Sequence, residues 1–237
     1  MRSTTLYASL ARIVSERVKV ITVEDPVEYH VAGVNQIQVN HQVGLDFAQA
    51  LRAMLRHDPD IIMIGEIRDK ETAEAAVQAS LTGHLVFSTL HTNDAAGAVT
   101  RLLDMGVEPF LVASSVEGVM AQRLVRRVCE RCAKDHVAEA GELPPVFVER
   151  FGSEVSLKVG AGCRDCRNTG FRGRIGMYEL LTMTEPLREL IMARANSSRI
   201  AHAALASNDL ALLRDDGFDK ARAGITTIAE VIRATKA

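Results

Sequence analysis

Four cysteines in two C-x-x-C pairs are the residues of this sequence whose spacing indicates chemistry most specifically. Cys129 and Cys132 form the first pair, and Cys163 and Cys166 form the second after an interval of thirty residues. Two such pairs supply four thiolates, which satisfy tetrahedral zinc and leave no position open for a substrate. Disulfides and a thioredoxin-like redox site fit the pattern less well, because a redox site carries one pair at the start of a helix. The cysteines therefore predict a structural zinc site.

Acidic residues and histidines flank three separate apolar runs. Glu24, Asp25 and Glu28 follow the run 18–23, Gly65 and Glu66 follow the run 61–64, and His84 and His91 lie on either side of the run 85–88. An acid held at the end of a buried strand, after a glycine that lets a phosphate, a metal ion or water approach, is typical of a Walker B segment. Each group alone is also compatible with a solvated strand end or an ordinary surface histidine. Three groups together favour a ligand site.

Four arginines are candidates for binding phosphate by charge-assisted hydrogen bonds. Arg52 and Arg56 are four residues apart on one expected helix, Arg68 follows Glu66 closely, and Arg101 lies on a later helix. A single arginine of this kind is more often an ordinary surface residue, so the group is suggestive only as a set.

These residues are carried by alternating helical and apolar segments. Helical spacing of apolar residues predicts helices at 4–18, 47–57, 71–81, 95–105 and 110–125, and apolar runs predict strands at 18–23, 61–64 and 85–88. The stretch between residues 26 and 46 is expected to be a polar loop. Such alternation is typical of a parallel sheet covered by helices on both faces, in which ligands bind beyond the carboxyl ends of the strands. The acids and histidines are thus expected to converge there.

The remainder of the chain has a different composition. From about 128 to 171 it is rich in Cys, Arg and Gly and shows no long periodic element, which predicts a metal-stapled insertion. A short strand at 177–183 and helices at 186–195, 199–207 and 228–235 are expected to follow. We therefore expect three segments, at 1–127, 128–175 and 176–237. Eight arginines in and near this segment predict a locally basic surface, namely Arg123, Arg126, Arg127, Arg131, Arg164, Arg167, Arg172 and Arg174. The plain interpretation of this surface is solvated charge. The alternatives are that it faces phosphates of a neighbouring subunit, an acidic lipid or an acidic partner.

Length and composition exclude several classes of protein. The 237 residues suit one large or two small domains, and 47% hydrophobic with 24% charged residues excludes a disordered chain. Lys and Arg number 28 against 30 Asp and Glu, a net charge of −2, so nothing indicates a nucleic-acid partner. Aromatic residues make up 4% and Trp is absent, which disfavours a stacking surface. No apolar run approaches the roughly 18–20 residues that span a bilayer, so we expect a cytosolic protein.

Several long segments of the sequence resemble one family. These segments are VEDPVEYH, LRAMLRHDPDIIMIGEIRD, ASLTGHLVFSTLHTNDAAGAVTRLLDMGVEPF and AQRLVRRVCERC, followed by GCRDCRNTGFRGRIGMYELL. They are similar to the type II secretion ATPases, the E proteins of the general secretory pathway, within the superfamily that also drives type IV pili. The resemblance runs from Ser3 to the end of the chain. It implies a RecA-like P-loop NTPase fold, of the α/β class, with a tetracysteine zinc segment and a small C-terminal helical region.

The resemblance also implies roles for individual residues. Glu66 and Glu28 are expected to polarise the attacking water and hold the magnesium shell, and His84 and His91 to contact the terminal phosphate of ATP. Glu24 and Asp25 belong to the family's acidic box, Arg52, Arg56, Arg68 and Arg101 match arginines around the nucleotide and between subunits, and the four cysteines match its zinc motif. Pilus retraction ATPases generally lack that motif, which favours secretion or pilus extension. The stretch 79–126 is more similar to the secretion proteins.

One departure from the family pattern concerns its glycine-rich nucleotide loop. The alignment places Arg2 where the family has the loop lysine, with Ser3 and Thr4 beside it, and the loop glycines have no counterpart. The amides and lysine of such a loop bind the phosphates. We therefore expect a carboxyl-terminal part of a secretion ATPase that is impaired in ATP binding.

The function expected from this resemblance is that of a cytoplasmic ATPase at the inner face of the bacterial inner membrane. Hydrolysis of ATP would drive pseudopilus assembly and protein export, with Mg2+ and Zn2+ as metals. The intact protein is expected to be a homo-hexamer, to bind inner-membrane components of the secretion apparatus, and to reach the membrane peripherally through them. A non-catalytic, zinc-stabilised assembly module of such a ring and a type IV pilus extension ATPase are the alternatives.

Overall fold

The chain folds into two compact units. The computed structural model describes residues 2–138 and 141–235, except for the side chains of Arg2 and Ser3. The first unit comprises the chain through Thr92 together with Ala96–Glu117 and Met183–Ala203. The second comprises Asn93–Ala95, Gly118–Thr182 and the chain from Ala204 onward.

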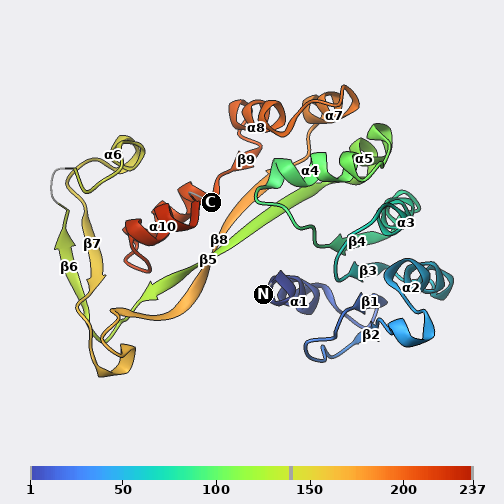
Figure 1. Ribbon diagram of the computed structural model, residues 1–237, viewed down its shortest axis with the longest axis horizontal. Helices are drawn as coiled ribbons and strands as arrows, with labels where there is room; N and C mark the ends of the chain where they lie inside the picture. Colours follow the sequence, from blue (N-terminus) through green and yellow to red (C-terminus); the bar gives the residue numbers. More distant parts are fainter. Residues whose placement is uncertain (1, 139–140, 236–237) are drawn as a thin grey trace. The chain divides into compact units, whose positions relative to one another are not determined.

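A four-stranded parallel sheet forms the centre of the first unit (Figure 1). Its strand order is β2-β1-β3-β4, with β1 at Val20–Glu24, β2 at Val34–Gln38, β3 at Ile61–Ile64 and β4 at Leu85–Ser88. The inner strands β1 and β3 are buried at every position, as in a parallel sheet covered on both faces. Among the described strands β4 pairs with β3 alone, and Leu85 is 49% exposed. The predicted α/β class is confirmed, although β2 was expected to be loop.

Helices cover both faces of this sheet (Figure 1). Helix α1 (Arg2–Ile13) packs Tyr7 and Leu10 against residues of β1 and β3, and α2 (Phe47–Met54) and α3 (Lys70–Leu81) lie on the other side. Asp46 and Asp69 begin α2 and α3 as N-caps, each accepting a hydrogen bond from a backbone N–H of the first turn. Each cap fixes the residue at which its helix begins. The Asp69 cap therefore limits the length of the turn between β3 and α3, which carries Glu66.

Further helical elements complete the first unit. They are η1 (His41–Val43), η2 (Leu55–His57), α4 (Ala95–Asp104), α5 (Pro109–Ser115), α7 (Glu185–Met192) and α8 (Ser197–Ala206), although α4 begins and α8 ends with residues assigned to the second unit. Among the described residues, no helix combines the length and hydrophobicity that crossing a bilayer requires.

A long antiparallel ribbon organises the second unit. Strand β5 (Gly118–Val128) pairs with β8 (Phe171–Thr182), which also pairs with the short β9 (Leu210–Ala211). Helices α9 (Leu213–Arg222) and α10 (Ile228–Thr235) pack on the ribbon around Phe218, Met177 and Val231. A second ribbon of β6 (Ala133–Val137) and β7 (Ser156–Gly160), with α6 (Pro145–Phe151) and η3 (Arg164–Cys166), carries the cysteine loops.

One expectation about this part of the chain is wrong. Residues 118–125 do not continue the helix expected at 110–125, because α5 ends at Ser115 and β5 follows. The helix-favouring residues of that stretch pair along their whole length with β8, and this pairing overrides local propensity. The segment 128–171, expected to have no long periodic element, holds two strands of five residues and a helix of seven, and α9 was not predicted. The division at 127/128 and 175/176 remains a prediction.

Glu230 joins α10 to β5 through a buried carboxylate. Its side chain is 3% exposed and accepts hydrogen bonds from the backbone and guanidinium of Arg126 at 3.0 and 2.8 Å. Arg233 donates two more, at 3.0 and 2.9 Å. The hydrogen bonds from Arg233 and then from Arg126 hold the pKa of Glu230 well below its ordinary value.

We expect Glu230→Gln to lower the free energy of unfolding at neutral pH by about 1–3 kcal/mol. The NH2 group of glutamine is a donor, and it would replace a carboxylate oxygen that accepts hydrogen bonds from the arginines. A lowered pKa stabilises the folded state above the unfolded pKa of about 4.3, and this stabilisation is lost as pH falls toward the folded value. The difference between variant and parent should therefore shrink near pH 3 in urea unfolding. Glu149→Gln, an exposed carboxylate on α6, is the control. Equal stability of Glu230→Gln and the parent at neutral pH would contradict the prediction.

Candidate functional site

An acidic cavity of about 130 Å³ lies beyond the carboxyl ends of β1 and β3. The acids that line it are those the sequence singled out, namely Glu24, Asp25, Glu28 and Glu66. Gly65 and Thr89 also line it, from the ends of β3 and β4. The predicted convergence of three strand ends is confirmed for these residues.

Glu66 is held by two basic side chains at this site. Its side chain is 14% exposed, and one oxygen accepts a hydrogen bond from Arg68 at 2.5 Å while the other lies 2.8 Å from Nε2 of His91. The hydrogen bond from Arg68 lowers the pKa of Glu66, burial opposes this effect, and His91 adds to it. Glu66 is therefore ionised at neutral pH, so His91 donates its Nε2 proton to the carboxylate.

Backbone contacts fix the turn that presents Glu66. The N–H of Gly65 donates to the carbonyl of Val23 at 2.8 Å, and the hydroxyl of Thr89 donates to the carbonyl of Gly65 at 2.7 Å. A Cβ added at Gly65 would lie 3.3 Å from that same Val23 oxygen, closer than most Cβ contacts. Glycine thus lets the chain pass close to β1 and turn into the cavity. The sequence analysis did not single out Thr89.

Glu24 holds the floor of the cavity and is 3% exposed. Its oxygens accept hydrogen bonds from the hydroxyls of Tyr7 and Thr22 and from the amide of Gln36. Burial, followed by the bond to Glu24, raises the pKa of Tyr7 to about 12. The Tyr7 hydroxyl also accepts from the backbone N–H of Glu28 at 3.2 Å and so positions the loop that carries Glu28. Nothing in the local sequence around Tyr7 signals this role.

Other predicted residues lie apart from Glu66 or are engaged elsewhere. His84 precedes β4, at the end of that strand opposite to His91, and its Nδ1 lies 2.9 Å from the carbonyl of Ala79. Arg52 pairs with Glu71 at 2.6 Å, and Arg56 and Arg101 are exposed. Thr4 is exposed on α1, and the side chains of Arg2 and Ser3 lie outside the described residues. The nucleotide roles of all these residues remain predictions.

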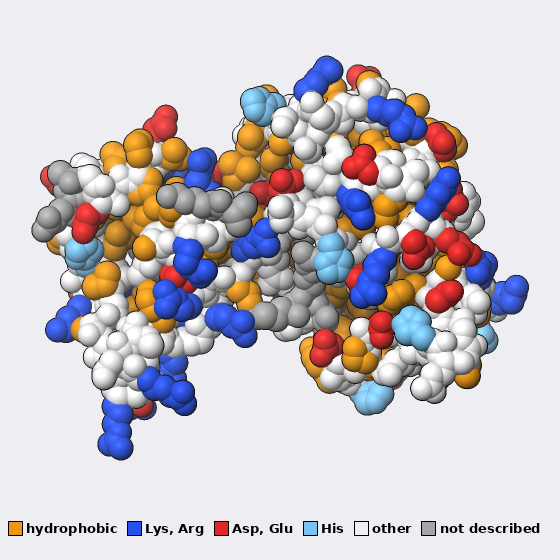
Figure 2. Space-filling model, in the orientation of Figure 1, with side chains coloured by type: hydrophobic (Ala, Val, Ile, Leu, Met, Phe, Trp, Pro, Cys, Tyr) orange, Lys and Arg blue, Asp and Glu red, His pale blue; other side chains and the backbone are white. Residues whose placement is uncertain are grey.

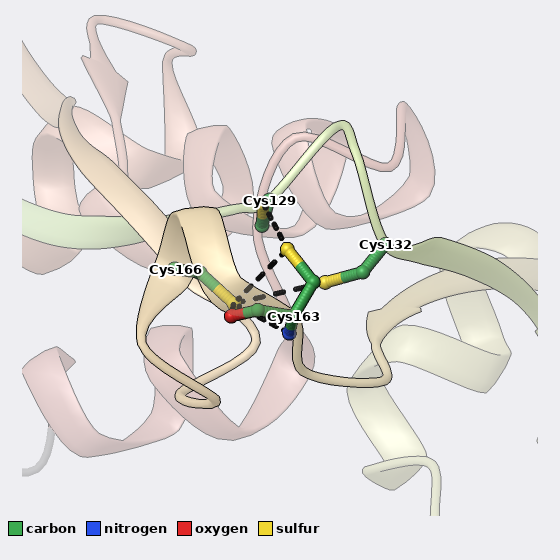
Figure 3. Close-up of side chains that lie close together, drawn as sticks. All are labelled: Cys129, Cys132, Cys163 and Cys166. Atoms are coloured by element: carbon green, nitrogen blue, oxygen red, sulfur yellow. Dashed lines mark hydrogen bonds between the residues drawn. The ribbon is translucent and has the colours of Figure 1, made fainter.

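The four cysteines of the second unit form one cluster, shown in Figure 3 with all four side chains directed inward from two loops. Their sulfur atoms lie within 4.8 Å of one another, with separations of 3.9 Å for Cys129 and Cys163, 3.8 Å for Cys132 and Cys166, and 3.7 Å for Cys163 and Cys166. Tetrahedral zinc with bonds of about 2.3 Å requires sulfur atoms about 3.8 Å apart. The donor set and its spacing fit zinc.

Backbone groups support these sulfurs. The N–H groups of Cys163 and Gly170 donate to the sulfur of Cys166 at 3.1 and 3.3 Å. Burial disfavours ionisation of Cys166, but these two donors together with hydrogen bonds from the Cys163 and Cys132 thiols outweigh it and hold its pKa at about 6. The two ends of the loop that carries Cys163 and Cys166 also come into close backbone contact, because a Cβ at Gly160 would lie 2.0 Å from the carbonyl oxygen of Gly170. Glycine at position 160 therefore allows the base of this loop to close.

Comparison with known proteins identifies relatives over almost the whole chain. It is 50% identical to "Type II secretion system ATPase E" of Vibrio cholerae over 99% of its own length and 46% of that protein. It is 48% identical to "Type IV pilus assembly ATPase PilB" of Thermus thermophilus, covering 99% of the chain and 26% of that protein. The chain thus spans about half the length of the type II secretion relatives that it matches.

A solved structure supports the same assignment. The "Pilus Retraction Motor PilT and Bound ADP" superposes with a TM-score of 0.70 at 27% identity, over 99% of this chain and 58% of that one. The sequence model of the family described as "Type II/IV secretion system protein" matches residues 2–233. With the parallel sheet, the acidic cavity and the cysteine cluster in place, the match over nearly the full length shows that this chain belongs to the type II/IV secretion system protein family, whose named relatives are secretion and pilus ATPases.

Proposed function

We propose that this chain is the catalytic part of a type II secretion ATPase that acts in the cytoplasm at the inner face of the inner membrane. The observation that carries the proposal is the placement of Glu66, hydrogen-bonded to His91, in a cavity that Asp25 and Glu28 also line. Hydrolysis of ATP would drive pseudopilus assembly and so export of folded proteins. The names of the relatives support the ATPase class, and the match to the Vibrio cholerae protein supports the choice of type II secretion.

The residues of the cavity have distinct tasks in this proposal. Glu66 is ionised and can accept a proton from the attacking water, while His91 holds the Glu66 carboxylate in place. His91 would also contact the terminal phosphate of ATP. Glu28 and Asp25 offer oxygen ligands of the kind that Mg2+ prefers, and bound Mg2+ would neutralise charge on the phosphates. Among the described residues the cysteine cluster is the one group with the geometry of a protein-only metal site, so magnesium would take its other ligands from phosphate and water.

Arg68 has its own role in this proposal, because its guanidinium donates a hydrogen bond to Glu66 and is also attracted by the charge of Asp25. Its pKa is raised mainly by Glu66 and, more weakly, by Asp25. A phosphate that enters the cavity would compete for this guanidinium and release the Glu66 oxygen for water. Arg52, Arg56 and Arg101 are proposed to act on nucleotide at an interface between copies of a hexamer, together with His84 and the start of α1 from Arg2 to Thr4. The inner-membrane partners of the secretion apparatus belong to the same proposal.

The chain alone is proposed to hydrolyse ATP poorly. Its 237 residues contain no GxxxxGK(S/T) pattern, the loop whose amides and lysine bind the phosphates. Losing a set of preorganised donors of this kind costs at least about a hundredfold in rate. We expect the purified chain with Mg2+ to hydrolyse ATP at least about a hundredfold more slowly than the Vibrio cholerae protein under the same conditions. A comparable rate that Glu66→Gln abolishes would overturn this proposal.

A non-catalytic, zinc-stabilised assembly module of a secretion ring is the second candidate, favoured by the four-cysteine cluster, which would hold zinc with no position open for a substrate. The two are separated by transplanting this chain into the corresponding half of the Vibrio cholerae protein and measuring binding of a non-hydrolysable ATP analogue. The catalytic candidate predicts binding and turnover in the chimera, and the module predicts binding through the nucleotide loop of the Vibrio cholerae half without turnover. Because the chain is 48% identical to PilB, a type IV pilus extension ATPase is the third candidate. Identifying the partner proteins by pull-down would decide between secretion and pilus extension.

A further inference from the structure

Glu179 is a buried acid to which the proposed reaction gives no role. Acidic side chains of this protein lie mostly at its surface, where Figure 2 shows them interspersed with those of Lys and Arg. Within the described part of the chain, Glu24, Glu179 and Glu230 are buried instead. Glu24 holds the floor of the acidic cavity and Glu230 binds two arginines, whereas Glu179 lies on β8 and is 6% exposed. Burying a carboxylate is costly unless it accepts hydrogen bonds, so the donor that Glu179 binds indicates its role.

The Glu179 carboxylate holds the first residue of α4. One of its oxygens accepts a hydrogen bond from the backbone N–H of Ala95 at 2.8 Å, and this bond is buried. Ala95 begins α4, and the first N–H groups of a helix have no acceptor within the helix itself. A negative charge at this end of a helix is also favoured by the helix dipole. Strand β8 therefore caps α4 from a position 84 residues later in the sequence.

A second side chain of the same ribbon holds the chain two residues before Ala95. The guanidinium of Arg123, on β5, donates a hydrogen bond to the side-chain oxygen of Asn93 at 3.0 Å. In the β5–β8 register Glu179 lies opposite Ala121, so Arg123 and Glu179 lie on one face of the ribbon. Residues 93–95 accordingly belong to the same compact unit as the ribbon, although the chain on either side of them does not.

The segment that carries His91 is also anchored before that residue. Thr89, directly after β4, donates its hydroxyl to the carbonyl of Gly65 at 2.7 Å. His91 thus lies in a short stretch of chain with fixed points on both sides, Thr89 before it and Asn93 after it. Its Nε2 lies 2.8 Å from Glu66, but its side chain is 71% exposed, so packing around the ring does little to hold it there. The two anchors of the backbone determine where the ring can reach.

We propose that Glu179 is a positioning residue for His91 and acts through the start of α4. By fixing Ala95, the carboxylate fixes the far end of the segment that carries His91 and so keeps Nε2 within reach of Glu66. Arg123 acts in the same way through Asn93, with a smaller effect because that contact is exposed. The consequence for ATP hydrolysis rests on the proposed function, whereas the placement of the His91 ring does not.

Ring resonances of His91 test this inference without any turnover. In the purified chain, labelled in its histidine rings, Glu66→Gln should shift the His91 signals, because the two side chains are in contact. The signals are assigned by their absence from His91→Gln. Glu179→Met removes the acceptor and nearly keeps the side-chain volume. In that background Glu66→Gln should shift the His91 signals by less than about a third as much, because the two residues are no longer coupled.

Two control variants separate positioning from a general loss of stability. Thr226→Val removes a different hydrogen bond of the second unit, from the buried Thr226 to the carbonyl of Arg126 at 2.8 Å, and should leave the response of the His91 signals as in the parent. Glu179→Gln keeps an oxygen that can accept from Ala95 and should keep at least about half of the response. An equal loss of response in Thr226→Val and Glu179→Met would overturn the inference, as would a complete loss in Glu179→Gln.

A variant at an exposed position decides the matter if Glu179→Met does not fold. Asn93→Ala breaks the contact with Arg123, and the fold should tolerate it because Asn93 is exposed. It should reduce the response of the His91 signals to about half of that in the parent. In that case an unchanged response in Asn93→Ala would overturn the inference.

Steady-state kinetics of the chimera with the Vibrio cholerae protein test the consequence for hydrolysis. Glu179→Met should lower kcat about ten- to hundredfold and change the KM for ATP less than about threefold. In the background of His91→Gln the same change should cost less than about twofold, because Glu179 then has no imidazole to position. An equal cost in both backgrounds, or an undiminished response of the His91 signals in Glu179→Met, would overturn the inference. Full turnover in Glu66→Gln would instead overturn the proposed function and leave the placement of His91 by Glu179 in force.

Discussion

Removal of zinc is expected to unfold the two cysteine loops while the parallel sheet of the first unit stays folded. Three pairs of the cysteine sulfur atoms lie 3.7–3.9 Å apart. Without the cation, the negative charges of thiolates at this distance repel one another. Structural zinc contributes about 10–16 kcal/mol of apparent binding free energy in zinc-finger peptides. The loss here is smaller because the long β5–β8 ribbon is supported by its own core around Phe218 and Met177.

Hydrogen exchange before and after treatment with a strong chelator measures this effect. Amides of 129–132 and 160–170 should lose protection, and amides of β1 and β3 should keep it. Cys132→Ser should lower the zinc content well below one per chain, whereas Arg164→Gln, a change in the same loop at a residue that is not a ligand, should leave it at one. Freshly purified, reduced protein with almost no zinc and unchanged exchange would rule out the four-thiolate site.

The second large effect is expected from Glu66→Gln in the chimera with the Vibrio cholerae protein. Glutamine keeps the shape of the side chain but removes the base that accepts a proton from water, a loss of about 10²–10⁴ in kcat. The amide also meets Arg68 and His91, which both point donors at this position. Affinity for ATP should change by much less, because the proposed role of Glu66 is to act on the attacking water and the metal shell, while other groups would bind the nucleotide.

Steady-state ATPase rates and analogue binding must therefore be measured separately. Glu74→Gln is the matched control, since Glu74 is a half-buried acid of α3 that pairs with Lys70 at 3.4 Å. Its rate should stay within about twofold of the parent chimera. If Glu66→Gln reduced binding and turnover in equal proportion, Glu66 would be a binding residue, and if it reduced neither, the cavity would not be catalytic.

Sequence periodicity predicts the parts of the fold in which local pattern and tertiary environment agree. The strands β1, β3 and β4 are short apolar runs, and the helices α2 and α3 begin at aspartate caps, so these elements are confirmed nearly to the residue. Strand β2 was missed because three of its five residues are Asn or Gln and only two are apolar, at the edge of the sheet. Strand β5 was mistaken for helix because its partner, β8, lies some fifty residues away in the sequence.

The candidate site shows the same limit. Glu66 and His91 were found because each follows a recognisable strand, and parallel strands bring their carboxyl ends together. Tyr7 was missed because its contact with Glu24 joins a helix to a strand across the fold, and a buried tyrosine on an amphipathic helix is usually core. The cysteine cluster was predicted completely, since C-x-x-C spacing carries its geometry locally.

The open side of β4 has a practical consequence for work with this chain in solution. Within the part of the chain that the structure describes, β4 pairs with β3 alone and Leu85 is half exposed, and an edge strand of this kind can pair through its main chain with an extended peptide. Concentrated samples should therefore self-associate, and measurements by sedimentation are sound only at dilutions where light scattering reports single molecules.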